Sequence, residues 1–319
     1  MKFNHIIEHT PPGTIYNLIS QLSKKYDNHK IHFINSSNKV NVIFDILKNN
    51  HFEIFVLHCT GRNLPIFSKI EKIITNVNRK NIYIYMHVSY DYLVYKKRYN
   101  AINKLKLLCK NGVLIISPSL EVSNQYNKHG IKSIVIEPGI TKFYAEDRNN
   151  LSKYYNRIIT TCTSDTLEYK KIKGIDKFYK LINDLSLEDR ALIAGCNLQD
   201  SKIESIKLNH DDFLNVLMHS IVYIQLSKYD SYNITAVEAK QFKIPIILSN
   251  IEGHIESADQ GYLVNNVVEA KNILQEIIDG DFDKSIVQMN YSNSIINESV
   301  ESFYERFKIL EKNENSIFS

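Results

Sequence analysis

The sequence lacks the features that mark membrane-spanning and secreted proteins. No apolar run approaches the roughly 18 residues that a transmembrane helix needs. The opening residues MKFNHIIEHTPPG contain neither a signal-peptide core nor a cleavage site after it. We therefore expect a cytoplasmic protein, with the inner face of the membrane as an alternative position.

Two patterns that carry redox or metal chemistry are also missing. The four cysteines, at positions 59, 109, 162 and 196, are far apart and include no C-x-x-C pair. We expect free thiols, the usual state in a reducing compartment. No G-x-G-x-x-G follows a strand-like segment, which disfavours a dinucleotide-dependent oxidoreductase.

Charge of one sign is not in large excess. Lys plus Arg is 39 and Asp plus Glu is 35, so the net charge is +4, too small to indicate a nucleic-acid partner. An apolar content of 44% with 23% charged residues is typical of a globular protein. A length of 319 residues suggests two domains, at roughly 100 to 200 residues per domain.

The sequence does contain a regular alternation of short apolar runs and longer segments with helical spacing. Segments such as TIYNLISQLSKKY place apolar residues at i, i+3, i+4 and i+7. Alternating strands and helices predict a parallel sheet covered by helices on both faces. The strand-like runs are KFNHIIE, KIHFIN, FEIFVLH, NIYIYMH, GVLIISP and SIVIEPG in the first half, and RIITTCT, RALIAGC, SIVYIQL and IPIILSN in the second.

This alternation predicts two α/β domains. A polar and charged segment at 142–156 interrupts it and is interpreted as a linker. The N-terminal domain is expected over 1–141 and the C-terminal domain over 157–300, with ligands in the cleft between them, where carboxyl ends of strands meet. A helical segment at 301–319 either packs back on the N-terminal domain or caps the chain.

The stretch HIIEH, with His5 and His9 at its ends, matches the H-x-x-E-H pattern of some zinc peptidases. That chemistry needs both histidines on one face of a helix. Here the stretch belongs to the first expected strand, where residues four apart are about 13 Å from each other. We therefore expect no metal ion here, and no metal or other cofactor elsewhere.

Two candidate residues of the first domain follow strands, at the edge where ligands collect in such sheets. Gly13, in PPGT, would let backbone N–H groups approach an anion at a helix start, although a plain turn fits as well. His87 ends NIYIYMH and can contact a substrate. His58 ends FEIFVLH in the corresponding place, and the pattern does not rank the two.

The segment KKIKGIDKF predicts that Lys173 and Gly174 open a helix after the strand RIITTCT. A lysine at a helix start opposes the helix dipole. An anionic diphosphate nearby would explain such a lysine, and a solvated basic turn is the alternative.

The stretch YDSYNITAVEAK places Asp230 and Glu238 on either side of an expected helix start near Asn233. The first N–H groups of a helix have no intrahelical acceptor and can bind phosphate oxygens. Glu238 would lie about 7 Å further along the axis, which suits a ribose diol. A carboxylate such as Asp230 beside a diphosphate is best explained by sugar hydroxyls. The alternative is an ordinary solvated helix start.

These residues resemble the C-terminal signature of the family 4 retaining glycosyltransferases, which have the GT-B fold. That signature is an acidic, a small and an aromatic residue, Gly or Asn, an aliphatic residue and, after three further positions, a Glu. Residues 230–234, DSYNI, followed by Glu238, fit it in register. The segment 241–264 is similar to the family's strand, small-residue loop and Gly-containing return. Other matching segments are KFNHIIEHTPPGT, NIYIYMH, SIVIEPGITKFY and KKIKGIDKF.

The resemblance implies a GT-B architecture of two Rossmann-like, doubly wound domains facing each other across a cleft. It implies transfer of a sugar from a nucleotide-diphosphate donor, UDP by family frequency, with retention and without a metal. The departing phosphate oxygen would deprotonate the acceptor on the same face. The implied donor-binding residues are Gly13, Lys173, Ser231, Tyr232, Asn233, Ile234 and Glu238, and the implied catalytic residues are His87, Asp230 and Glu238.

The resemblance also implies a role for each of these residues toward one part of the donor. Lys173 would neutralise the diphosphate, and Glu238 would hold the ribose. Asp230 would bind hydroxyls of the donor sugar, while His87 would lie near the reacting carbon. Backbone N–H groups of residues 232–234 would hold the β-phosphate.

Two positions depart from the family's pattern. The family commonly has Glu where this chain has Asp230, whose carboxylate is one methylene shorter. The family also commonly has Arg shortly before its Lys, whereas this chain offers only Lys170 and Lys171. Lysine does not grip phosphate as arginine does, so weak donor binding is expected.

The segment 94–110, VYKKRYNAINKLKLLCK, is basic and has apolar residues at helical spacing. Such a helix can lie on an anionic membrane surface, which would suit a lipid-linked acceptor. The alternative, which we favour, is a helix packed on the core with a solvated basic face.

The leading hypothesis is a cytoplasmic retaining glycosyltransferase that acts on a glycan, a lipid-linked acceptor or another glycoconjugate, in surface polysaccharide synthesis. One alternative is another GT-B enzyme, such as a nucleotide-sugar epimerase. A second is a non-catalytic, glycosyltransferase-like partner subunit, which the missing Arg motivates.

Overall fold

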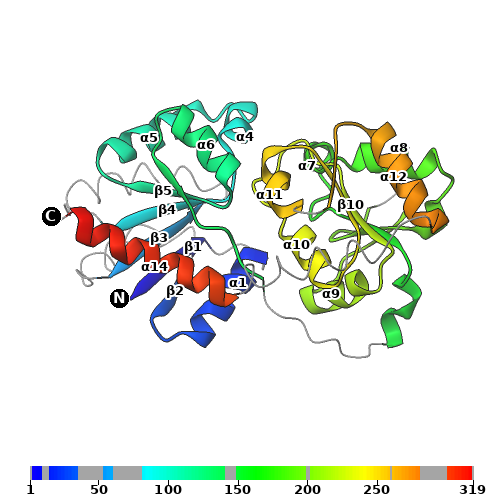
Figure 1. Cartoon of the computed structure of the whole chain (residues 1–319), viewed down its shortest axis with the longest axis horizontal. Coiled ribbons are helices and arrows are strands. Elements are labelled where there is room, and N and C mark those ends of the chain that lie inside the picture. The colour runs from blue at the N-terminus through cyan, green and yellow to red at the C-terminus, as the bar shows by residue number, and fades with distance from the viewer. Residues whose placement is uncertain are drawn as a thin grey trace. The chain divides into compact units, whose positions relative to one another are not determined.

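The chain forms two compact units in a computed structural model (Figure 1). Unit 1 comprises Met1–Thr141 and Glu298–Ser319, and unit 2 comprises Lys142–Asn297. The residues that the structure describes are 2–8, 14–34, 53–59, 81–140, 149–198, 202–258, 261–280 and 300–317.

Unit 1 is built on a parallel sheet whose six described strands have the order β2-β1-β3-β4-β5-β6. Strands β3 and β4 are buried along their whole length, as expected of apolar runs covered on both faces. The strands are β1 Phe3–Glu8, β2 His29–Ile34, β3 Ile54–Cys59, β4 Ile82–Met86, β5 Leu114–Ser117 and β6 Ser133–Val135. The described helices are α1 Thr14–Lys25, α4 Tyr90–Tyr95, α5 Tyr99–Lys110, α6 Leu120–Lys128 and α14 Val300–Ile317.

Helices cover both faces of this sheet. One apolar core joins the sheet to α4, α5 and α6. The core on the other face includes Ile19 and Leu22 of α1 together with Phe303, Phe307 and Leu310 of α14. Figure 1 shows α14, in red, lying across the sheet, although it comes from the far end of the sequence. The C-terminal helix is therefore part of the core of unit 1.

Unit 2 repeats the architecture with the strand order β12-β11-β10-β7-β8-β9 in its described residues. Its strands are β7 Ile158–Thr161, β8 Ala191–Ala194, β9 Glu204–Ile206, β10 Val222–Gln225, β11 Ile246–Ser249 and β12 Tyr262–Val264. Its α-helices are α7 Leu167–Lys173, α8 Ile175–Asn183, α9 His210–Met218, α10 Ile234–Gln241, α11 Glu252–Ala258 and α12 Val267–Asp279, and its 3-10 helices are η1 Asn149–Tyr154 and η2 Glu188–Arg190.

Two apolar cores also cover the sheet of unit 2. One includes residues of α8 and α12, and the other includes residues of α9, α10 and η1. Leu151 and Tyr154 of η1 are buried in the second core, so residues 149–154, which we had interpreted as part of a linker, pack within unit 2.

The doubly wound α/β class predicted from the sequence is confirmed, and each of the ten predicted strand segments contains a strand. The short strands β9 and β12, of three residues each, were not predicted as strands. Within 241–264, residues Glu252–Ala258 form α11 rather than the expected loop. The four cysteines are free thiols, as predicted. Among the described helices, none has the length and apolar character of a membrane span.

Candidate functional site

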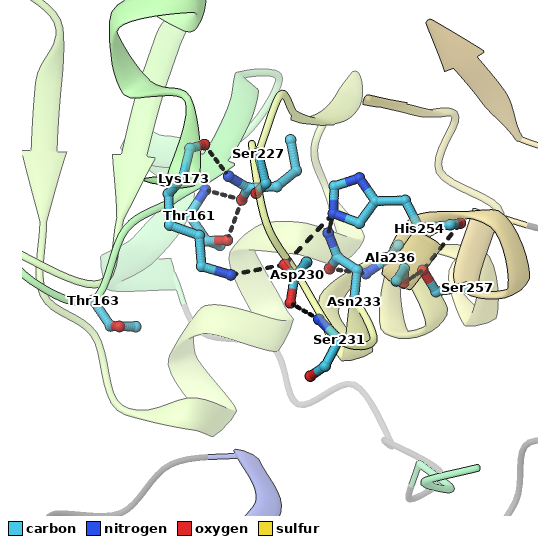
Figure 2. Close-up of polar contacts among 12 residues, drawn as sticks. Thr161, Thr163, Lys173, Ser227, Asp230, Ser231, Asn233, Ala236, His254 and Ser257 are labelled. Carbon is cyan, nitrogen blue, oxygen red and sulfur yellow. Dashed lines mark hydrogen bonds and ion pairs between the residues drawn. The ribbon is translucent and has the colours of Figure 1, made fainter. Parts of the chain in front are cut away.

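The strand order of unit 2 indicates a ligand site before any side chain is considered. The chain runs outward from β7 through β8 to β9, and then continues on the other side of β7 with β10, β11 and β12. Connections that leave adjacent strands in opposite directions open a crevice at their carboxyl ends, here between β7 and β10. The residues drawn in Figure 2 lie around this edge of the sheet.

Gln225, the last residue of β10, links the two central strands at this edge. Its Oε1 accepts hydrogen bonds from the hydroxyl groups of Thr161 at 2.7 Å and Tyr223 at 3.0 Å. Its Nε2 donates to the backbone oxygen of Lys173 at 2.6 Å. Because Gln225 is buried, these bonds satisfy its amide and fix the end of α7 on the strand.

Lys173 is the last residue of α7, so the prediction that it opens a helix is wrong. Gly174 follows with a φ of 69°, the left-handed conformation that ends a helix, and α8 begins at Ile175. A Cβ on Gly174 would lie 1.9 Å from the backbone oxygen of Leu226. The helical spacing in KKIKGIDKF comes from two consecutive helices. A cation at a helix end is favoured by the dipole, so the position alone does not imply a ligand.

The side chain of Lys173 forms an ion pair with Asp230, which lies in the turn before α10. The two charged atoms, Nζ and Oδ2, are 2.7 Å apart, and the side chains are 21% and 12% exposed. Burial alone would raise the pKa of Asp230, but the ammonium of Lys173 outweighs it and holds this pKa well below its usual range. Burial would likewise lower the pKa of Lys173, but Asp230 raises it. Both groups are therefore charged at neutral pH.

The amino end of α10 begins where the sequence predicted. Asn233 is the N-cap, and its Oδ1 accepts a hydrogen bond from the N–H of Ala236 at 3.0 Å. Helix geometry leaves the N–H groups of Ile234 and Thr235 without an intrahelical acceptor. These donors follow directly on the turn that contains Asp230, so the arrangement suits an anion.

Helix α11 holds the turn that contains Asp230. A Cβ on Gly253 would lie 2.1 Å from the backbone oxygen of Asp230, so a glycine is needed for this close approach. His254 is fully buried, with Nδ1 3.0 Å from the backbone oxygen of Ser249 and Nε2 3.3 Å from Nδ2 of Asn233. The same Nε2 is 3.5 Å from Oδ2 of Asp230. His254 thus contacts both the turn and the helix cap.

Glu238 lies in the second turn of α10 and is 4% exposed. Its Oε1 is 3.2 Å from Nε2 of His210, the first residue of α9. Burial alone would lower the pKa of His210, but Glu238 raises it above its usual value. The second oxygen, Oε2, has no hydrogen-bond partner among the residues that the structure describes. A buried carboxylate oxygen without a donor costs free energy until a ligand or water satisfies it.

In unit 1, His87 follows β4 at the carboxyl edge of the sheet. Its N–H donates to the backbone oxygen of Cys59 at 2.8 Å, and its ring stacks on Tyr85 with centroids 4.6 Å apart. Its Nε2 lies 3.0 Å from Nδ1 of His58. Burial lowers the pKa of His87 to about 3, so the ring is neutral near pH 7. The two histidines that the sequence did not rank are therefore hydrogen-bonded to each other.

The structure brings part of the predicted site into one network. Lys173, Asp230, Ser231 and Asn233 are joined by the contacts drawn in Figure 2, in which the backbone N–H of Ser231 donates to Oδ1 of Asp230 at 3.0 Å. Tyr232, Ile234 and Glu238 continue the same turn and helix. His87 belongs to unit 1, and Gly13 lies outside the described residues.

Four residues of this region were missed at the level of sequence: Thr161, Gln225, His210 and His254. Gln225 had a usable signal, because it is a polar residue at the end of an apolar strand, as His87 is. His254 had none, since its partners come from a different helix cap and a different strand.

The basic segment 94–110 contains the end of α4 and all of α5. Its apolar residues at helical spacing are packed in the core of unit 1, which supports the core-packed interpretation. Tyr99 and Leu107 remain 56% and 42% exposed among the lysines. The buried residues are Ala101, Ile102, Leu105 and Leu108.

Comparison with known proteins establishes the class of fold. No family model and no curated protein matches the sequence. Solved structures match over nearly the whole chain, and the fold they share with it is GT-B, as the sequence resemblance implied.

Three of these structures illustrate the likeness. HepE of Anabaena in complex with UDP-glucose has a TM-score of 0.73 and 13% identity, over 99% of this chain and 100% of that one. Sucrose-phosphate synthase of Thermosynechococcus elongatus has a TM-score of 0.75 and 11% identity, over 99% of each chain. A UDP-forming alpha,alpha-trehalose-phosphate synthase of Burkholderia xenovorans, in complex with glucose-6-phosphate, has a TM-score of 0.69 and 9% identity, over 98% of this chain and 100% of that one.

Proposed function

We propose that this protein is a retaining glycosyltransferase that uses a UDP-sugar as donor. The observation that carries the proposal is the buried carboxylate of Glu238, whose Oε2 lacks a partner among the described residues. It belongs to the helix whose amino end adjoins the Lys173–Asp230 pair. The likeness to a UDP-glucose complex and to a UDP-forming synthase supports UDP as the nucleotide.

Each part of the donor has a matching group in unit 2. The ribose hydroxyls donate to the unsatisfied oxygen of Glu238. The diphosphate meets the ammonium of Lys173 and the backbone N–H groups of residues 232–234, so the proposal needs no metal ion. Ser231 and Gly13 also belong to the proposed donor site, and Asp230 accepts hydrogen bonds from hydroxyls of the sugar.

The ion pair gives this site a state that is stable without a ligand. In that state the charge of Lys173 is neutralised by Asp230 at 2.7 Å. A diphosphate brings its own negative charge to the ammonium, and the carboxylate of Asp230 is then available to sugar hydroxyls. The resembling family has Glu at the position of Asp230. The shorter side chain of Asp230 reaches Lys173 from the turn, which suits a change of partner from Asp230 to the diphosphate.

The reaction transfers the sugar with retention. The acceptor oxygen forms a bond to the anomeric carbon as the bond from that carbon to the β-phosphate oxygen breaks. The acceptor's proton passes to the departing phosphate oxygen on the same face, which leaves UDP and a glycoside. His87, neutral at pH 7, is assigned a hydrogen bond to the donor sugar near the reacting carbon.

The acceptor is proposed to be a glycan or lipid-linked glycoconjugate of a surface polysaccharide. The exposed Tyr99 and Leu107 among basic residues would let α5 touch an anionic membrane that carries such an acceptor. Sedimentation with anionic vesicles tests this contact. A Tyr99→Ser, Leu107→Ser double variant should lose binding, and equal binding by the variant would remove the membrane from the proposal.

A turnover assay tests the proposed function. The protein is incubated with UDP-, GDP- and ADP-sugars, with and without a mixture of glycan acceptors, and free nucleoside diphosphate is measured. Release of UDP that rises with acceptor, together with a new glycoside of retained configuration, supports the proposal. An epimerase would convert the sugar without needing acceptor, and a non-catalytic subunit would bind UDP-sugars without releasing UDP.

A further inference from the structure

A row of four histidines runs through the sheet of unit 1, from His29 on β2 through His5 on β1 and His58 on β3 to His87 after β4. Nδ1 of His29 is 2.8 Å from Nε2 of His5. Nδ1 of His5 is 3.1 Å from Nε2 of His58, and Nδ1 of His58 is 3.0 Å from Nε2 of His87. Each contact therefore joins Nδ1 of one ring to Nε2 of the next.

Strand register places these rings on one face of the sheet. His5 lies two residues from Phe3, and His58 lies two residues from Val56, so each shares a face with a residue of the core beneath α14. Phe307 of α14 contacts the ring of His5, with centroids 5.3 Å apart. The row is therefore a line of polar rings within a layer of otherwise apolar side chains.

Burial keeps the rings of this row neutral. It lowers the pKa of His29 to about 4 and lowers the pKa values of His5 and His58 well below their usual range. A neutral imidazole carries one N–H and one acceptor nitrogen. A row of four such rings has four ring protons for three hydrogen bonds.

Only two arrangements make all three hydrogen bonds. In one, every ring carries its proton on Nδ1, and Nδ1 of His87 is a donor. In the other, every ring carries its proton on Nε2, and Nδ1 of His87 is an acceptor. Any mixture of the two would leave one contact with two protons or with none, which is costly for buried groups. The four tautomers are therefore coupled.

The far end of the row is closed. Nε2 of His29 is buried and has no hydrogen-bond partner within the part of the chain that the structure describes. The ring is stacked on Phe3 at 4.6 Å, and Tyr304 and Phe307 lie edge-on at 5.4 Å and 5.9 Å. A proton that entered at His87 would find no acceptor at this end, so the row does not conduct protons to solvent. What the row does is hold its four rings in one common tautomer.

We propose that His58, His5 and His29 are positioning residues, which hold His87 in the same tautomer as the rest of the row, so that its Nδ1 is either a donor or an acceptor of a hydrogen bond. This rests on the proposed function, in which His87 binds the donor sugar. A hydroxyl group can meet either form of the ring, but its own proton must then point in opposite directions. A fixed tautomer therefore favours one orientation of the sugar hydroxyl.

Nuclear magnetic resonance of protein labelled with 15N-histidine tests this inference without any substrate. Long-range proton–nitrogen correlation spectra distinguish a protonated ring nitrogen from an unprotonated one, and single substitutions assign the signals. We expect all four rings of the native protein to be the same tautomer. One ring of the opposite tautomer, or one charged ring at neutral pH, would overturn the proposal.

The variant His58→Phe tests the positioning of His87 directly, because it keeps an aromatic ring but removes the partner of Nε2. The tautomer of His87 is then no longer tied to the row, so the shifts of both its ring nitrogens should change. Unchanged shifts would mean that the row does not set the tautomer, so the proposal would fail. Tyr304→Phe, which alters a neighbour of His29 but no atom of the row, should leave all four rings unchanged.

The signals of His129, which lies in unit 1 outside the row and stacks on Tyr90, show whether each variant is folded. If His58→Phe does not fold, the tautomers of the native protein still decide the question. Absence of transferase activity would refute the proposed function and leave this test of the row intact.

Discussion

The two units have the same architecture but differ in their buried polar groups, which are neutral rings in unit 1 and an ion pair in unit 2. In unit 1, the row at the sheet consists of neutral rings that share protons. In unit 2, the edge of the sheet has opposite charges, Lys173 and Asp230, 2.7 Å apart. Neutral rings can direct a hydroxyl group but cannot balance a diphosphate. The Lys173–Asp230 pair can balance a diphosphate, because the anionic ligand takes the place of Asp230 beside the ammonium of Lys173.

The two arrangements should also respond differently to acid. The histidines of the row have folded-state pKa values below the unfolded value of about 6.5. Above that pH both states are neutral, so the row's full contribution to stability is present. Below that pH, the histidines of the unfolded chain become protonated while those of the folded chain stay neutral. The free energy of unfolding therefore falls until the pH reaches the folded-state pKa values.

The largest expected effect is therefore acid destabilisation of unit 1. Each histidine of the row should lower the free energy of unfolding by about 1.4 kcal/mol between roughly pH 7.5 and 5.5, or by about 6 kcal/mol for all four. Hydrogen exchange measured by mass spectrometry reports each unit separately. Amides of β1 and β3 should lose protection, while those of β7 and β10 change much less.

In unit 2, the pKa shift of one histidine has the opposite sign. His210 has a raised pKa beside Glu238, so its contribution is present below about 6.5 and is lost as the pH rises through its folded-state value. Equal loss of protection in both units on acidification would contradict the comparison.

A smaller effect is expected from breaking the ion pair. Lys173→Met leaves the largely buried carboxylate of Asp230 without its cation and should lower the free energy of unfolding by about 2 to 3 kcal/mol, which allows for partial exposure. Urea denaturation followed by circular dichroism measures it. Lys180→Met is the matched control, because its pair with Asp184 in the same unit is 63% and 38% exposed, and solvent weakens such a pair so that its loss should change the stability much less. Equal losses of unfolding free energy in the two variants would show that the Lys173–Asp230 pair contributes no more than an exposed ion pair does.

Local signals in the sequence predicted the fold and part of the site. Apolar runs predicted the longer strands, and an Asn before a helical pattern predicted the start of α10, since a cap acts within four residues. The predicted helix start at Lys173 failed because one apolar period continued across Gly174, where the left-handed backbone separates two helices. The spacing of apolar residues does not show where one helix ends and the next begins.

Contacts between distant residues were beyond the sequence. HIIEH suggested a metal pattern, yet His5 bonds to His29 and His58, and these pairings depend on the register of three strands. The bond between Lys173 and Asp230 depends on the neighbouring positions of β7 and β10 in the sheet. Sheet order and register come from the packing of the whole unit, and local patterns of residues do not reveal them.

The most direct test of the proposed donor site is calorimetric titration with UDP. The native protein should bind UDP, and Glu238→Gln should bind it about 10- to 100-fold more weakly, because a hydrogen bond to a charged group contributes about 1.5 to 3 kcal/mol. Glu276→Gln, a change at an exposed position of α12, should bind UDP as the native protein does. Equal affinity in Glu238→Gln and the native protein, or no binding by the native protein, would contradict the account.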